Sequence, residues 1–207
     1  MNNLAPLTGR GSFTFTLGGQ RFRGVAVPLA DYFAWTALQG SIGSPEHVAW
    51  YVPLLAERQM GGAKASPIDA EWVSQNVRLA HLNALDSALL EEVDPGDAFG
   101  DERRQFPLHG GKFAALSYSL GEAAAHNEFL THHEGKPPMN ERLERVALAL
   151  RLRARGGIDP ANIDLDWMVR HVKLPELLAL EHLFQTGRLG SDSAPVPKAE
   201  GDGEKKE

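Results

Sequence analysis

At residues 163–174 the chain reads Ile-Asp-Leu-Asp-Trp-Met-Val-Arg-His-Val-Lys-Leu, and at residues 68–79 it reads Ile-Asp-Ala-Glu-Trp-Val-Ser-Gln-Asn-Val-Arg-Leu. The two stretches lie 95 residues apart, and their similarity continues into the leucine-rich segment that follows each of them. From Ile68 to Leu85, eight of eighteen positions are identical with their counterparts. Self-similarity at a fixed spacing is typical of a chain built from repeated units. We therefore interpret the sequence as two copies of one unit.

A second pair of matching stretches extends the repeat toward the N-terminus. Residues 15–22 align without a gap with residues 106–113, which lie 91 residues later. An Arg-x-x-Gly-Gly pattern at residues 58–62 recurs at residues 153–157, again 95 residues apart. The change of spacing from 91 to 95 residues indicates a loop insertion in the second copy, at residues 134–138.

The two units cover residues 12–93 and 103–189, and the same plan is predicted for each. In the first unit, Phe and Thr residues alternate before Gly18-Gly19, and this pattern predicts a β-hairpin over residues 12–27. Apolar residues at helical spacing predict the helices that follow. The predicted fold is α+β and mostly α, with two tandem repeats that each contain a β-hairpin followed by about four helices.

Three further segments lie outside these units. Residues 1–11 contain one proline and two glycines and predict a flexible lead-in. The turn cluster Asp94-Pro95-Gly96-Asp97 marks the boundary between the units. Residues 190–207 are rich in Pro, Gly, Ser and charge, with more acidic than basic residues, and predict a disordered acidic tail.

The composition excludes several classes of function. An apolar content of 43% and a charged content of 23% are those of an ordinary globular protein. The chain has no cysteine, which excludes a disulfide framework and a thiol nucleophile. We expect no membrane span and no signal peptide, and therefore a cytoplasmic protein. The formal net charge of −6 argues against a nucleic-acid partner, because phosphate binding needs a basic surface.

Four aromatic residues are the predicted anchors of the two cores. Trp72 and Trp167 occupy the same position of the repeated stretch, and Phe22 and Phe113 occupy the same position of the two hairpins. Large aromatic side chains bury much apolar area, so we expect each tryptophan to hold its short helix against its own unit. The alternative is that a tryptophan ring anchors a partner, which would require an exposed ring edge.

Histidines of the second unit are the strongest hint of an enzyme. Glu128 and His132 are four residues apart and would face the same side of a helix, with His126 and His133 nearby. The spacing differs from that of a zinc-protease helix and no third ligand from a distant segment is evident, so a solvated helix end is the favoured interpretation. The Gly-Gly pairs join two strands and are not phosphate loops. We assign no catalytic, cofactor-binding or metal-binding residue.

One predicted helix of the second unit is strongly basic. Its arginines are Arg142, Arg145, Arg151, Arg153 and Arg155. A solvated helix face is the simpler interpretation, and a docking patch for an acidic partner is the alternative.

The order of these motifs resembles that of a known family. A Phe-x-Leu-Gly-Gly-x-x-Phe hairpin, a Leu-x-Asp helix and a closing Ile-Asp-x-Glu-Trp-Val helix with a leucine-rich partner are similar to the small tail assembly chaperones of long-tailed bacteriophages and related phage-like tail systems. The resemblance spans residues 13–90 in the first unit and mainly residues 106–113 and 163–184 in the second.

The resemblance implies a non-enzymatic protein of the host cytoplasm. It implies that the chain binds and solubilises the helical tape measure protein during tail assembly, with the tail tube protein as a further candidate partner and self-association left open. The expected partner-binding residues are Leu178 and Leu183, which lie beside the apolar stripe of the last helix, together with Arg145 and Arg153. Two alternatives stay open: a structural component or adaptor of a tail or baseplate, and a metal-dependent hydrolase that uses the histidine cluster.

Overall fold

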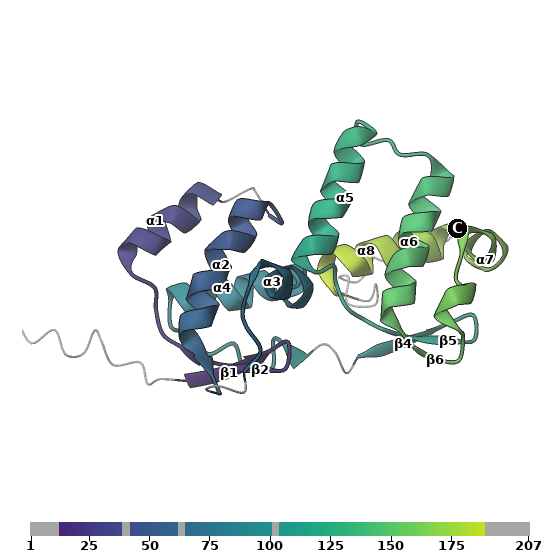
Figure 1. Cartoon of the computed structure of the whole chain (residues 1–207). Coiled ribbons are helices and arrows are strands. Elements are labelled where there is room, and N and C mark those ends of the chain that lie inside the picture. Colours follow the sequence, from purple (N-terminus) through teal and green to yellow (C-terminus); the bar gives the residue numbers. More distant parts are fainter. Residues whose placement is uncertain (1–12, 39–41, 62–64, 101–103, 189–207) are drawn as a thin grey trace, which may run out of the picture.

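The computed structural model of the chain describes residues 13–38, 42–61, 65–100 and 104–188. The predicted lead-in (residues 1–11) and acidic tail (residues 190–207) lie outside this part of the chain. Two groups of elements follow one another, each with four α-helices and one small antiparallel sheet (Figure 1). The predicted α+β, mostly α class is therefore confirmed, whereas the origin of the two groups by duplication stays a prediction.

Unit one contains the elements that lie before residue 101. They are β1 (Phe13–Leu17), β2 (Gln20–Gly24), α1 (Leu29–Leu38), α2 (Pro45–Arg58), β3 (Gln59–Met60), α3 (Ala70–Asn76), a 3-10 helix (Leu79–His81) and α4 (Leu82–Leu90).

Unit two contains the elements that follow residue 103. They are β4 (Gln105–Leu108), β5 (Gly111–Ala114), α5 (Leu120–His132), α6 (Met139–Arg153), β6 (Ala154–Gly156), a 3-10 helix (Pro160–Asn162), α7 (Leu165–His171) and α8 (Leu174–Thr186). The strands and α-helices have the same order as in unit one, and each begins close to the position expected from the spacing of 91 or 95 residues. No helix in the described part of the chain is long and apolar enough to cross a membrane.

Both hairpins place a phenylalanine of the first strand opposite a phenylalanine of the second. Phe15 pairs with Phe22, and Phe106 pairs with Phe113. The two central residues of each turn have positive φ, as a tight two-residue hairpin of type I′ requires. His109 takes such a position in the second turn, with φ 45°, where the first turn has a glycine.

A third strand completes each sheet and was not predicted. β3 follows α2 directly and pairs with β2, and β6 follows α6 directly and pairs with β5. These strands are too short to show the alternation of apolar and polar residues by which strands are recognised in a sequence. The glycines of the Arg-x-x-Gly-Gly pattern end them, because Gly61 and Gly156 have φ of 136° and 142°, which strongly favour glycine.

The repeated tryptophan stretch forms α3 and α7, and both helices have the same N-cap. The side chain of Asp69 accepts a hydrogen bond from Trp72 N, and that of Asp164 accepts one from Trp167 N, at 2.8 Å in both cases. Trp167 is buried in the core of its unit. Trp72 is half-buried and packs on the ring of Phe22, with 5.8 Å between the ring centroids. Both tryptophans therefore hold their helices against their own units, as predicted.

The core of unit one extends past the predicted boundary. Residues 94–97 form the expected turn region, but Phe99 beyond them is buried and its ring centroid lies 5.4 Å from that of Phe15. Phe22 and Phe113 are both fully buried in the cores of their units.

Each unit also buries one arginine at a matching position. Arg58 donates hydrogen bonds to the carbonyl oxygens of Val25 and Leu54 at 3.0 and 2.9 Å. Arg153, which is 2% exposed, donates to the carbonyl oxygens of the corresponding residues, Leu116 and Ala149, at 2.8 and 3.0 Å. The arginine thus ties the second helix of each unit to the chain that leaves the sheet. The predicted role of Arg153 in partner binding is wrong, because its guanidinium is enclosed within the unit.

Candidate functional site

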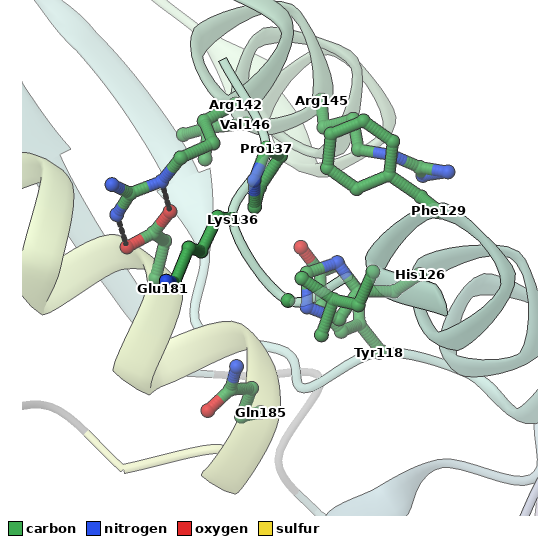
Figure 2. Close-up of a pocket in the computed structure, with 12 residues that line it drawn as sticks. Tyr118, His126, Phe129, Lys136, Pro137, Arg142, Arg145, Val146, Glu181 and Gln185 are labelled. Carbon is green, nitrogen blue, oxygen red and sulfur yellow. Dashed lines mark hydrogen bonds and ion pairs between the residues drawn. The ribbon is translucent and has the colours of Figure 1, made fainter. Parts of the chain in front are cut away.

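A cleft opens in unit two between α5, the connection from α5 to α6, α6 and α8. Figure 2 shows its residues around a common space. Its volume is about 510 Å³, which is within the range of small-molecule and side-chain pockets but too small for a whole helix. The lining residues are Tyr118, His126, Phe129, Leu130, Gly135, Lys136, Pro137, Arg142, Arg145, Val146, Glu181 and Gln185.

Tyr118 and His126 form the inner part of the cleft (Figure 2). Their ring centroids are 5.3 Å apart. Burial raises the pKa of Tyr118 to about 12, so its hydroxyl stays protonated. Burial, together with the charge of Arg145, lowers the pKa of His126, so its imidazole is neutral at pH 7. Among the described residues no group hydrogen-bonds the buried Nδ1 of His126.

Charged side chains line the outer part of the cleft. Arg142 donates two hydrogen bonds to the carboxylate of Glu181, at 3.1 and 2.7 Å, which joins α6 to α8. The hydrogen bonds that Arg142 donates to Glu181 raise the pKa of Arg142. Arg145 lies over the ring of Phe129 at 4.2 Å and donates to the carbonyl oxygen of Ala125 at 2.6 Å. With Lys136, the lining has three cationic side chains and one carboxylate, so it favours an anionic group.

Unit one has a cleft at the corresponding place. It has a volume of about 360 Å³ and is lined by Trp35, Leu38, Ile42, His47, Leu79, Leu82, Asn83, Asp86 and Gln185. Four of these residues are the counterparts, 91 or 95 residues earlier, of lining residues in unit two: Trp35 of His126, Leu38 of Phe129, His47 of Arg142, and Asp86 of Glu181. Corresponding elements thus line a cleft in both units. Gln185 of α8 lines both clefts, and the cleft of unit one is the more apolar.

The carboxylate in the cleft of unit one is engaged differently. Tyr51 donates its hydroxyl hydrogen to Asp86 at 2.5 Å, and burial raises the pKa of both groups. Burial also lowers the pKa of His47, which is therefore neutral at pH 7. The residues that line this cleft include no lysine or arginine that could pair with Asp86, whereas Arg142 pairs with Glu181 in the cleft of unit two.

The predicted histidine cluster does not come together. His126 lies in the cleft, His132 is exposed, and His133 forms a 3.0 Å ion pair with Glu141 and a 2.9 Å hydrogen bond with the carbonyl oxygen of Phe129. Within the described ranges, no group of three or more His, Cys, Asp or Glu side chains is placed to hold a metal ion.

The predicted partner-binding residues fall into two groups. Leu178 is 51% exposed and lies one helical turn before Glu181, and Arg145 lines the cleft. Leu183 is only 1% exposed and packs in the core of unit two, so its predicted role is wrong. The apolar face of α8 is broader than the stripe inferred from the sequence and includes Leu183, just as the corresponding Ala88 is buried in the core of unit one.

Several residues of the cleft were missed by sequence reasoning. Tyr118, Lys136 and Glu181 were not singled out, although Glu181 matches Asp86 and both are acidic. A search for repeated polar positions within the otherwise apolar closing helices would have found this pair. Lys136 belongs to the loop insertion, which lines the cleft of unit two.

Comparison of the chain with protein-family models, with curated proteins and with solved structures finds no match.

Proposed function

We propose that the chain is a non-enzymatic chaperone that holds helical segments of a client protein by inserting client side chains into its two clefts. The observation that carries this proposal is the recurrence of a cleft, lined by corresponding elements, in both units. A reaction centre would need a matched set of acid, base or nucleophile, whereas the two clefts share a position in their units but differ in chemistry. Corresponding positions with different chemistry suit a protein that binds two parts of one extended partner.

The linings indicate what each cleft accepts. The cleft of unit one, with Trp35, Leu38 and Ile42, suits an apolar side chain. The cleft of unit two combines Phe129 with Arg145 and suits an apolar side chain next to an acidic one. An amphipathic helix presents both kinds of residue on neighbouring positions.

Exposed apolar residues at the edge of the second cleft support the same proposal. Met139 and Leu178 are 48% and 51% exposed, and each lies one turn from a member of the Arg142–Glu181 pair that joins α6 and α8. An apolar margin around a polar pocket is typical of sites that bind a helix. Two weak sites on one chain also raise the effective concentration of the second contact once the first has formed.

We further propose that the client is the tape measure protein of a phage-like tail, which the resemblance of the hairpin and tryptophan motifs implies. Such a protein is a very long helix with exposed apolar stripes. These apolar stripes must be shielded from solvent before the tail tube forms around the protein. A chaperone of this kind dissociates before the tail is complete.

The experiment is co-expression with the candidate tape measure protein. The parent should keep the client in the soluble fraction, and Leu178→Asp should reduce that fraction several-fold. Leu152→Asp is the matched control, because Leu152 is also exposed but lies on α6 away from the cleft lining. Equal client solubility with and without the parent would refute the chaperone proposal. Stoichiometric amounts of the chain in purified tails would favour the structural-component alternative instead.

A further inference from the structure

The two units are joined by a short set of main-chain hydrogen bonds. Leu120 N donates to the carbonyl oxygen of Val77 at 2.8 Å, and Leu79 N donates to the carbonyl oxygen of Tyr118 at 2.9 Å. Arg78 lies 3.8 Å from the carboxylate of Glu122 across the same joint. Unit one contributes the end of α3 and the 3-10 helix, and unit two contributes the start of α5 with the residues before it.

Each unit supplies a different half of the joint. The region of unit one that corresponds to the start of α5, and the region of unit two that corresponds to the end of α3, therefore take no part in it. We call the region at the start of α1 the head (Val27, Leu29, Asp31 and Phe33), because it corresponds to the part of unit two that enters the joint. We call the region between α7 and α8 the socket (Val169, Val172, Lys173 and Leu174), because it corresponds to the part of unit one that receives it.

Exposure differs sharply between these regions and their counterparts. Leu120 is fully buried and packs in the core of unit one, whereas the corresponding Leu29 is 74% exposed. In the socket, Val169 and Leu174 are 65% and 58% exposed, whereas Leu79 packs against the cores of both units. Large apolar side chains are thus exposed at the places where their counterparts form the joint.

The polar groups of the unused halves match one another as well. Lys173 of the socket replaces Arg78, and Asp31 of the head replaces Glu122, so the pairing of a cation with a carboxylate is kept. In the joint, Ala80 N donates a hydrogen bond of 3.1 Å to Ser117 Oγ. The residue that corresponds to Ala80 is Pro175, which has no N–H, and the residue that corresponds to Ser117 is Ala26, which has no hydroxyl. Neither side is therefore left with an unpaired group.

We propose that copies of this chain associate head to tail, with the head of one copy seated in the socket of the next. Leu29 N would donate to the carbonyl oxygen of Val172 of the other copy, and Leu174 N to that of Val27. Leu174 N lies in the first turn of α8, where N–H groups lack partners within the helix. Such a contact uses two different surfaces, so it does not close on itself as a two-fold dimer does and it extends to a chain of copies. This inference goes beyond the proposed function and does not depend on the client.

Complementary variants test the proposal. The head variant carries Leu29→Asp and Phe33→Asp, and the socket variant carries Val169→Asp and Leu174→Asp. All four side chains are exposed, so circular dichroism and the urea midpoint should stay close to those of the parent. In sedimentation and light scattering, the parent should show a mass that rises with concentration beyond two chains, and each variant alone should be a single chain.

The decisive measurement is the equimolar mixture of the two variants. The head variant keeps an intact socket and the socket variant keeps an intact head, so the mixture should form a complex of one copy of each and nothing larger. A control with Leu148→Asp and Leu152→Asp, both exposed on α6 outside the two regions, should assemble like the parent. A parent that remains a single chain at every concentration overturns the proposal, as does an assembly that survives in either variant alone.

Discussion

Replacing Arg153 by methionine should destabilise the protein far more than the same replacement of Arg58. Both arginines are buried, and both donate to carbonyl oxygens at matching positions. Arg153 also donates hydrogen bonds of 2.7 and 2.9 Å to the two oxygens of Glu122, whereas the nearest carboxylate of Arg58 is the exposed one of Glu57, at 3.7 Å. Methionine retains much of the aliphatic volume of arginine, so the comparison isolates the polar contacts.

The expected magnitudes follow from what each substitution leaves behind. Arg153→Met leaves the carboxylate of Glu122 partly buried with weaker partners, Ser119 N at 2.8 Å and Arg78 at 3.8 Å, and breaking one side of a buried ion pair costs about 3–5 kcal/mol. Arg58→Met leaves only carbonyl oxygens without a donor, which costs about 1–3 kcal/mol. The difference should be about 2 kcal/mol, a large part of the total stability of a domain.

Urea unfolding at pH 7 measures both losses, and a third variant checks their cause. Adding Glu122→Gln to Arg153→Met removes the stranded charge and should restore about 1 kcal/mol or more. Burial opposes ionisation of Glu122, but the bonds from Arg153 outweigh it and lower the pKa of the carboxyl. In the parent this contribution is therefore complete above pH 4.5 and is lost as the pH falls below it. Equal losses for the two arginines, or no recovery in the double variant, would refute the reasoning.

Three further predictions concern stability. Leu183→Asp should prevent folding, because it places a charge in the core, whereas Leu178→Asp should change the urea midpoint little; similar midpoints would contradict the assigned burial. Trp167→Ala should cost about 3–5 kcal/mol in the same assay, and a loss below about 1 kcal/mol would show that the ring is not part of the core. Burial lowers the pKa of His47 and of His126, so stability should be complete above pH 6.5 and should decrease as the pH falls below it. Replacing both histidines by glutamine should flatten this part of the pH profile, and an unchanged slope would rule them out as its cause.

The plan of secondary structure could be predicted because it rests on local patterns. The Asp that precedes each tryptophan helix is an N-cap, the Gly-Gly turn sets the first hairpin, and apolar spacing marks the closing helices. Each of these signals involves only a few neighbouring residues, so it can be recognised in the sequence without knowledge of the fold. The short third strands were missed because two or three residues carry no such period.

The clefts could not be predicted because they depend on distant contacts. Arg142 meets Glu181 across 39 residues of sequence, and the connection from α5 to α6 lines the same cleft as α8. The error at Leu183 has the same origin. The sequence places it next to the stripe of Leu177 and Leu180, but only the packing of α8 in the folded unit shows that this side of the helix is covered too.

The main-chain character of the joint has a consequence for how such a chain can change over generations. Every residue other than proline carries the same N–H and C=O groups, so most substitutions at Val77, Leu79, Tyr118 or Leu120 leave its hydrogen bonds in place. Substitutions in one half of the joint therefore preserve the main-chain hydrogen bonds that it forms with the other half. A gene for this chain could gain or lose whole units by recombination, and each inserted unit would bring both halves of the connection with it.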